Sequence, residues 1–243
     1  MKCPHQPGTR AHELRKQNLR DAQPCAGGLT KVVPRFAALL ITIATGACLT
    51  GCSFLKPARD TSRHYVLTPL PAIERSKAAP GASGVGLGQV KLPEYLLDTS
   101  LAVRNGTNQI DYLRGDLWAE RLDTGIQRVL AANLATLLPS DQIRLSAWRS
   151  EDVGAEIYVA VEQFDVDSSG RAVLVAWWRI LSPGGEKTLK ASASRLERQG
   201  PSPGSNPSGA IATLSDLIAE LSRELVQTLN ETSPTLRPAA VSK

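Results

Sequence analysis

The alternation of apolar and polar residues is clearest between residues 157 and 198, where it predicts three successive antiparallel strands. The segments 157–166, 173–181 and 187–198 are separated by Asp167-Ser168-Ser169-Gly170 and Ser182-Pro183-Gly184-Gly185, which are rich in turn-forming residues. The middle segment is apolar on both faces, as is typical of a central strand. The third carries many Lys, Arg and Ser side chains and is expected at the edge of the sheet.

Further strands are expected before this meander. Residues 101–104 and 109–112 flank Asn105-Gly106-Thr107-Asn108, and Asn-Gly between alternating segments predicts a β-hairpin. Short strands are also expected within 63–67, 84–92 and 143–148. The alternating glycines of 84–92 share one face, which favours close approach of another backbone or a helix. A phosphate-binding loop is disfavoured, because a proline and a glutamate follow where the dinucleotide-binding fingerprint requires a helix.

Two segments have apolar residues at three- and four-residue spacing, which predicts amphipathic helices. The first runs from Trp118 to Leu137, with Asp116 as its expected N-cap and Glu120 in its first turn. The second covers residues 211–229. These elements together predict an α+β fold with two long helices packed on one face of a mixed, mainly antiparallel sheet.

The N-terminal part of the chain has a different pattern, a short apolar run behind two basic residues. A basic region, an apolar run and small residues before a cleavage point are typical of a secretory signal. The run ends in Leu49-Thr50-Gly51-Cys52, which resembles the lipobox of bacterial lipoproteins. In that family the cysteine thiol receives a diacylglycerol, the chain is cut just before it, and the new N-terminus is acylated. Cys52 is therefore the predicted lipid attachment site, and Leu49, Thr50 and Gly51 complete the lipobox.

The alternative to a lipobox is a plain signal or membrane-spanning segment with an incidental cysteine. The sixteen residues from Phe36 to Gly51 are diluted by threonine and glycine. A spanning helix needs about 20 mostly apolar residues, which disfavours this alternative. Residues 1–30 form a polar extension before the signal, either a genuine long basic region or the product of an upstream start.

Cleavage before Cys52 changes what the composition implies. It removes 51 of the 243 residues, with seven of the 28 Lys and Arg and two of the 23 Asp and Glu, so that 192 residues with 21 basic and 21 acidic side chains remain. The formal charge of +5 thus belongs to the leader, and the balance of the mature part gives no support for nucleic-acid binding. Cys52 is the last cysteine of the chain and His64 the last histidine, so neither a disulfide nor a cysteine metal site is expected.

The mature sequence contains none of the catalytic arrangements with a recognisable spacing, such as a zinc motif, a P-loop or a Gly-x-Ser-x-Gly elbow. The acidic pairs Glu151-Asp152 and Asp165 with Asp167 are expected to be solvated turn carboxylates rather than a glycosidase pair. We therefore predict no enzyme activity, no cofactor, and no catalytic or metal-binding residues. Some of the four tryptophans must be core residues, and an exposed one would indicate contact with a partner or with lipid. These are Trp118, Trp148, Trp177 and Trp178.

Several segments, in this order, resemble the ABC-transport auxiliary lipoproteins of the PqiC type. The resemblance covers about residues 65–229, with one departure, Arg121, where the family pattern has proline. Proline is tolerated in a first helical turn, so the departure concerns only the start of the helix. The matching segments are Tyr65–Pro71, Gly84–Gly86, Val90–Leu96, Trp118–Glu120, Leu122–Asp123, Gly125–Ile126, Arg128–Leu130, Asn133–Leu134, Trp148–Arg149, Phe164 and Trp178–Leu181.

The resemblance implies a non-catalytic docking subunit of an MCE-type ABC transport system, which moves phospholipid or other hydrophobic molecules across the periplasm. Its implied partners are a periplasmic MCE-domain protein and inner-membrane transporter components, with homo-oligomerisation, for example as a ring, left open. Ser53 follows the lipid cysteine where an aspartate would retain a lipoprotein at the inner membrane, so the implied anchor, with palmitate-like acyl chains, is in the outer membrane. No nucleic acid is expected as a partner.

The predicted organisation is a signal peptide with its extension at 1–51, a lipidated tether at 52–62, an auxiliary domain at 63–230 and a disordered tail at 231–243. Two other classes of function remain open at this point. One is a structural envelope lipoprotein without a transporter, and the other is a lipid-anchored enzyme, which the missing catalytic arrangements disfavour.

Overall fold

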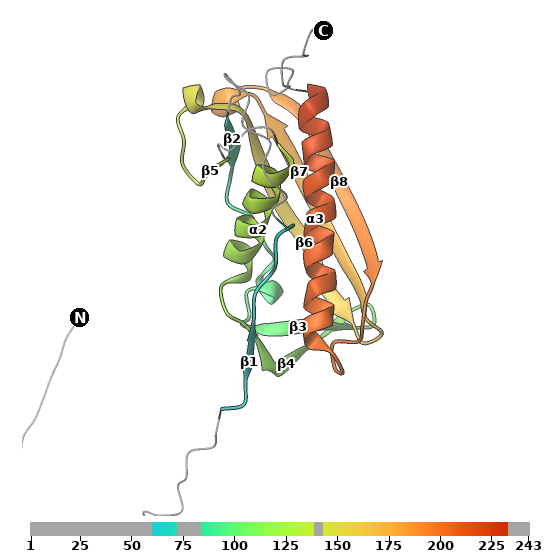
Figure 1. Cartoon of the computed structure of the whole chain (residues 1–243). Coiled ribbons are helices and arrows are strands. Elements are labelled where there is room, and N and C mark those ends of the chain that lie inside the picture. The colour runs from blue at the N-terminus through green and yellow to red at the C-terminus, as the bar shows by residue number, and fades with distance from the viewer. Residues whose placement is uncertain (1–59, 72–83, 139–142, 233–243) are drawn as a thin grey trace, which may run out of the picture. The chain divides into compact units, whose positions relative to one another are not determined.

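The computed structural model describes residues 60–71, 84–138 and 143–232, which form eight strands, two long helices and three short 3-10 helices (Figure 1). The long helices are α2 (Leu122–Leu137) and α3 (Pro207–Thr232), and the short ones are η2 (Glu94–Leu96), η3 (Ser150–Asp152) and η4 (Pro183–Gly185). The strands are β1 (Arg63–Tyr65), β2 (Gly84–Leu87), β3 (Ser100–Asn105), β4 (Gln109–Trp118), β5 (Ile143–Leu145), β6 (Val153–Asp167), β7 (Arg171–Leu181) and β8 (Thr188–Gln199).

The longest strand, β6, organises the sheet. On one side it pairs with β7 over most of its length. On its other side β2 pairs with its first part, from Val153 to Ile157, and β3 pairs with its end at Val166 and Asp167. A strand of 15 residues is about 50 Å long, which is enough for two partners on one side. β5 extends the sheet from β2, while β4 and then β1 extend it from β3.

The sheet is mixed, and the prediction that it is mainly antiparallel is wrong. Among the described strands, β1–β4, β2–β5, β2–β6 and β3–β6 are parallel pairs, whereas β3–β4, β6–β7 and β7–β8 are antiparallel. Each antiparallel pair is joined by a short turn, so sequence patterns reveal it. The parallel pairs join strands that no tight turn can connect. Overall the fold is α+β.

The locally encoded parts of the sheet agree with the sequence patterns. β3 and β4 form the predicted hairpin, with Gly106 in the left-handed region at φ 72°. β6, β7 and β8 form the predicted meander. In the described part of the chain β8 pairs only with β7, which confirms its predicted place at an edge.

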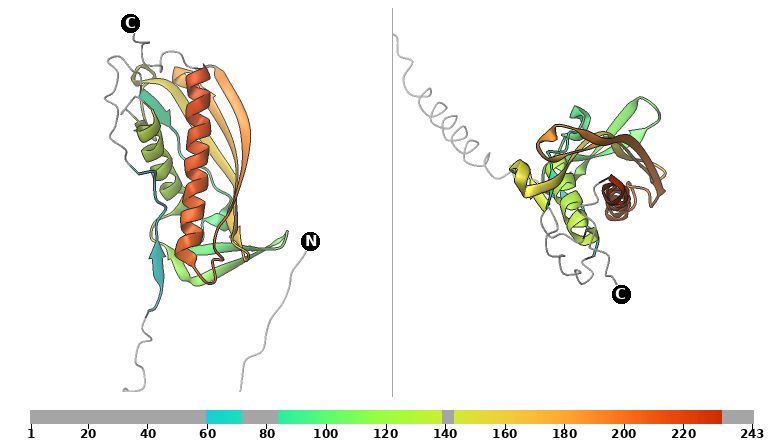
Figure 2. Two further views of the ribbon diagram at one scale, coloured as in Figure 1. Left: turned by 45° about the vertical axis from the view of Figure 1, so that its right-hand side comes forward. Right: turned by 90° about the horizontal axis from the view of Figure 1, so that it is seen from above.

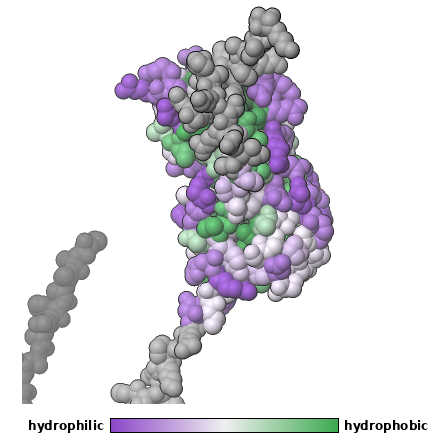
Figure 3. Space-filling view, in the orientation of Figure 1, coloured by the Kyte–Doolittle hydropathy of each residue, from purple (hydrophilic) through white to green (hydrophobic). Residues whose placement is uncertain are grey.

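The two long helices lie side by side on the concave side of the curved sheet, and α3 runs along β6, β7 and β8 (Figure 2). Their apolar stripes and the inward residues of the sheet form one hydrophobic core. On the helical face the exposed hydrophobic areas are small and interrupted by polar ones (Figure 3). The side chains with no solvent exposure include Ile126, Leu130, Leu134, Ile157, Leu174, Ile180, Leu217, Ile218, Leu221, Leu225 and Leu229.

One buried polar group joins three segments of this core. Asn133 of α2 is fully buried, and its amide nitrogen donates to the Ser222 hydroxyl of α3 at 3.1 Å. Its carbonyl oxygen accepts a hydrogen bond from the backbone N–H of Leu70, after β1, at 2.8 Å. Ser222 in turn donates to the Ile218 carbonyl at 2.7 Å. Because these buried groups all have partners, the link holds both helices and the N-terminal segment in one arrangement.

The first long helix begins later than predicted, because β4 continues to Trp118. Asp116, the expected N-cap, is a buried residue of this strand. Its carboxylate pairs with Arg63 of β1 at 2.8 Å and accepts a hydrogen bond from the Tyr65 hydroxyl at 3.1 Å. Glu120, expected in the first turn, also precedes the helix. Asp116 therefore connects β1 to β4, and the prediction that it caps a helix is wrong.

Candidate functional site

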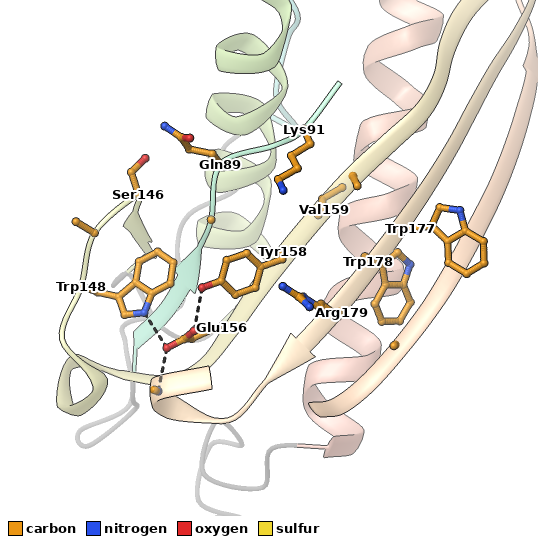
Figure 4. A pocket seen from close by; sticks show the side chains of 15 residues that line it. Gln89, Lys91, Ser146, Trp148, Glu156, Tyr158, Val159, Trp177, Trp178 and Arg179 are labelled. Carbon is orange, nitrogen blue, oxygen red and sulfur yellow. Dashed lines mark hydrogen bonds between the residues drawn. The ribbon is translucent and has the colours of Figure 1, made fainter. Parts of the chain in front are cut away.

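The candidate site is a groove on the face of the sheet that points away from the helices. Along β6 the residues Ile157 and Val159 belong to the core, so Glu156, Tyr158 and Ala160 face the opposite side. There the surface is hollowed by an open cavity of about 950 Å³ (Figure 4). We call it the outer groove and define it by Lys91, Trp148, Glu156, Tyr158, Trp177 and Arg179.

A buried carboxylate organises one end of the outer groove. Glu156 is 5% exposed and accepts hydrogen bonds from Trp148 Nε1 at 3.0 Å, the Tyr158 hydroxyl at 3.1 Å and the backbone N–H of Gly184 at 2.9 Å. Burial, together with the hydrogen bond to Glu156, raises the pKa of Tyr158. The carboxylate thus ties β6 to the segment that follows β5 and to η4. It fixes the two aromatic rings, whose centroids lie 6.5 Å apart.

Gly86 of β2 and Gly88, which directly follows this strand, explain how these rings reach the sheet. A Cβ on Gly86 would lie 2.5 Å from the Trp148 ring, and one on Gly88 would lie 2.6 Å from the Tyr158 ring. Both distances are shorter than real Cβ contacts, so only glycine leaves room for the aromatic side chains. The expectation of a close approach is correct, but the expected partner, another backbone or a helix, is wrong at these two positions, where the neighbours are mainly aromatic rings.

Two cationic side chains stand on either side of β6 in the outer groove. Lys91 lies beside Ala160, to which its backbone is bridged, and the Arg179 guanidinium lies 5.2 Å from the centroid of the Tyr158 ring. Within the part of the chain that the structure describes, neither forms an ion pair with a carboxylate. Figure 4 shows the Arg179 side chain directed toward the Tyr158 ring. The groove therefore presents positive charge next to aromatic surface.

The four tryptophans have different environments. Trp118 and Trp178 are buried, and Trp178 Nε1 donates to the Ser194 hydroxyl at 2.7 Å. Trp148 is partly buried over Gly86. Trp177 is 55% exposed on the outer face, where it pairs with Ala160 of β6 and Ala193 of β8. Because alanines on both sides cannot cover it, Trp177 forms an exposed aromatic surface at the groove.

A second buried carboxylate lies farther along β6, on the same face. Asp165 is 1% exposed and forms an ion pair with Arg104 at 2.6 Å, while Gln163 donates to it at 2.9 Å. The Tyr95 hydroxyl donates to it at 3.0 Å, and burial, followed by the charge of Asp165, raises the pKa of Tyr95 to about 12. The prediction that Asp165 is a solvated turn carboxylate is therefore wrong. Asp167, by contrast, stabilises the turn, because its carboxylate accepts a hydrogen bond from the backbone N–H of Ser169 at 2.8 Å.

The predicted lipid attachment residue Cys52 and the lipobox residues Leu49, Thr50 and Gly51 lie outside the described residues, and their roles stay predictions. No helix in the described ranges is both long and apolar enough to cross a membrane. Over the same ranges there is no group of three or more His, Cys, Asp or Glu side chains that could hold a metal ion.

The sequence patterns did not identify Glu156, Lys91 or Arg179 as parts of one site. The alternating glycines did indicate a close contact, but not that Trp148 and Tyr158 would make it. Alternation along the strand places Glu156 on the face opposite Ile157 and Val159, so the pattern gives no signal that this carboxylate is buried. The partners that satisfy it come from other segments, which the spacing along the chain cannot identify.

The sequence identifies the class of protein, an auxiliary component of ABC-type transport. The family model described as "ABC-type transport auxiliary lipoprotein component" matches residues 65–226, and the chain belongs to this family. The match extends from the end of β1 into α3 and so includes every element of the outer groove.

Individual relatives support the same assignment. The chain is 26% identical to the "Intermembrane transport lipoprotein PqiC" of Escherichia coli strain K12 over 142 residues, which cover 57% of this chain and 71% of that protein. A crystal structure of an uncharacterised protein matches with a TM-score of 0.56 and 19% identity, over 69% of this chain and 98% of that one. Protein XCC0632 from Xanthomonas campestris matches with a TM-score of 0.53 and 13% identity, over 70% and 96%. At these identities the two structures show a shared fold.

Proposed function

We propose that this protein is a lipid-anchored, non-catalytic docking subunit of an MCE-type ABC transport system that moves lipids or other hydrophobic molecules across the periplasm. The observation that carries the proposal is the family match over residues 65–226, which spans almost the whole described fold. The similarity to an intermembrane transport lipoprotein, PqiC, supports transport between membranes as the process. The MCE-domain partner and the inner-membrane components follow from the resemblance of the sequence to the PqiC type.

The proposed anchor is the outer membrane, facing the periplasm. Cys52 carries the lipid and Ser53 gives no inner-membrane retention signal. A single acyl chain binds a membrane only marginally, whereas two or more give stable attachment, and lipoprotein maturation supplies several. The segment from Cys52 to β1 then acts as a short tether for the folded domain.

The proposed role is docking rather than chemistry. The two buried carboxylates of β6, Glu156 and Asp165, are surrounded by donors that hold them in place. Their hydrogen bonds join segments of the fold, so we assign them a structural role rather than a catalytic one. The alternatives are a structural envelope lipoprotein without a transporter and a lipid-anchored enzyme. Both are outcomes that the following experiment separates from docking.

The test is recovery of the transport system with the full-length, C-terminally tagged chain after crosslinking in intact cells. We expect an MCE-domain protein and an ABC-transport component to be enriched at least about tenfold over a tagged, unrelated outer-membrane lipoprotein. Recovery of neither component, with the chain correctly located in the envelope, would refute docking and favour the structural alternative. Hydrolytic activity of the purified chain, lost in a variant with an intact fold, would instead favour the enzyme.

A further inference from the structure

We propose that the outer groove binds an extended acidic segment, with at least one apolar side chain, of a protein subunit of the transport system. This inference rests on the proposed function and adds the surface and the chemistry of the contact. It is carried by charge, by exposed aromatic area and by the position of the groove in the domain.

Charge complementarity is the first argument. Lys91 and Arg179 are exposed, and neither forms an ion pair with a carboxylate within the described ranges. Other arginines of the outer face differ, because Arg171 and Arg195 both pair with Glu197 at 2.7 Å. The carboxylate in the groove, Glu156, is buried and held by uncharged donors. The accessible charge of the groove is therefore positive, which fits acidic side chains.

The apolar surface is the second argument. Trp177 is 55% exposed between Ala160 and Ala193. Tryptophan and arginine are enriched among the residues that contribute most of the binding energy at protein interfaces. An apolar side chain of the partner can cover the Trp177 ring while its neighbouring carboxylates reach Lys91 and Arg179.

The width of the groove favours an extended segment. Lys91 rises on one side of β6 and Arg179 on the other, with Tyr158 and Ala160 between them. Two strand spacings correspond to about 10 Å, so an extended chain lying across the strands spans the distance between the two cationic residues with about three residues. Residues two positions apart in an extended segment point to the same side, about 7 Å from each other, so an acidic and an apolar residue at this spacing can both face the groove.

The position of the groove favours a protein over the anchoring membrane. β1, which follows the tether, belongs to the part of the sheet built from β1, β4 and β3, and β3 meets β6 at Val166 and Asp167. The groove lies on the first half of β6, at Glu156 to Ala160. Val166 lies six positions after Ala160 along the strand, which corresponds to about 20 Å. The groove thus lies in the half of the domain away from the tethered end.

The experiment is site-specific photocrosslinking in intact cells with the full-length chain. A photoreactive phenylalanine analogue replaces Trp177, and the matched control replaces Val66, which is 51% exposed and follows β1. Mass spectrometry identifies the crosslinked peptide. We expect position 177 to capture an acidic segment of a transport subunit, and position 66 to capture at least about tenfold less of it.

The charge is tested in the same assay. Arg179→Glu is expected to lower the crosslink at position 177 at least about fivefold, whereas Arg179→Lys retains most of it. Arg223→Glu, on the exposed side of α3, makes the same charge change away from the groove and is expected to have little effect. Circular dichroism and a urea titration of each variant confirm that the domain is folded.

The outcomes separate the groove from the proposed function. If the tagged chain recovers the transport system but position 177 gives no crosslink, the proposed binding at the outer groove is refuted, whereas the docking function stands. A crosslink to phospholipid, or to a second copy of this chain, would also refute this binding. If the transport system is not recovered at all, the proposed function fails first and this inference fails with it.

Discussion

At the scale of single residues, two buried carboxylates on the outer face of β6 are stabilised in different ways. Asp165 is paired with the guanidinium of Arg104, whereas Glu156 accepts its three described hydrogen bonds from uncharged groups. An ionised group removed from water needs such donors, because its desolvation is costly. In both sites a tyrosine hydroxyl is one of the donors. Only the neutral phenol can donate this hydrogen bond, so the folded state favours the neutral form of each tyrosine.

The close packing of Trp148 on β2 leads to a first prediction. Gly86→Ala should destabilise the domain by about 1–3 kcal/mol, because the new Cβ would lie 2.5 Å from the Trp148 ring, and the ring must move away from Glu156. Urea unfolding measures the change, and a red shift of tryptophan emission reports exposure of the ring. Gly115→Ala is the matched control, since no atom lies within 4 Å of its added Cβ. Equal effects of the two substitutions would contradict the packing argument.

The Tyr95–Asp165 contact leads to a second prediction, on pH dependence. The pKa of Tyr95 is raised from 10.0 to about 12 by burial and then by Asp165. The folded state therefore favours the neutral phenol, and this stabilisation is complete below pH 10 and is lost as the pH rises from 10 to about 12.

The measurement is the free energy of unfolding in urea at pH 8 and at several values between 10 and 11.5. Tyr95→Phe should cost about 1.5 kcal/mol at pH 8, because a hydrogen bond to a charged group is lost. The substitution should also make the free energy of unfolding fall less steeply above pH 10 than in the unsubstituted protein. If the free energy of unfolding falls equally steeply in both proteins, Tyr95 is not the cause of the pH dependence.

At the scale of elements, the length of β6 decides how the sheet is assembled. It has room for β2 and β3 on one side, and the register with β7 shifts between Val161 and Gln163. The turn from β6 to β7 is also tied to the end of β8, since the backbone N–H of Gly200 donates to the Gly170 carbonyl at 2.9 Å. The meander is thus closed at this end by a contact between segments that are 30 residues apart.

The two glycine turns give a third prediction, which compares two similar substitutions. Gly106 and Gly170 both have positive φ, 72° and 89°, so alanine at either position costs about 1–2 kcal/mol in backbone strain. A Cβ on Gly106 meets no atom within 4 Å, whereas one on Gly170 would collide with the backbone of Gly200 and Pro201.

Gly170→Ala should therefore be clearly more destabilising than Gly106→Ala, by at least about 1 kcal/mol. Thermal and urea unfolding followed by circular dichroism measure both variants. The same loss of stability in both would show that the contact between the turn and residues 200–201 does not constrain the meander.

At the scale of the whole molecule, the proposed attachment to the membrane is predicted to depend on Cys52. Cys52→Ala should remove the lipid and leave either a soluble periplasmic form or an uncleaved precursor. Fractionation of the envelope, with antibody detection of the chain, measures this, and more than about tenfold less mature protein is expected in the outer-membrane fraction. Ser53→Ala is the control, since it leaves the lipid cysteine in place. Unchanged attachment of Cys52→Ala would contradict the lipobox prediction.

The sequence by itself determined the elements that depend on neighbouring residues. Alternation and turn residues identified the hairpin at Gly106 and the meander of β6, β7 and β8, and helical spacing identified α2 and α3. These patterns suffice because an antiparallel pair with a tight turn and an amphipathic helix are both encoded within short segments. The segment order also indicated the family of transport auxiliary lipoproteins, to which the chain belongs.

Only the tertiary structure decided which distant strands lie next to one another, and with them the outer groove. Alternation assigns a residue to one face of a strand but does not name the neighbouring strand, so the parallel pairing of β2 with β6 could not be read from the pattern. The same reason explains Asp165, which is buried because Arg104, 61 residues away, lies beside it. It also explains Glu156, whose donors Trp148, Tyr158 and Gly184 meet only when three segments pack together.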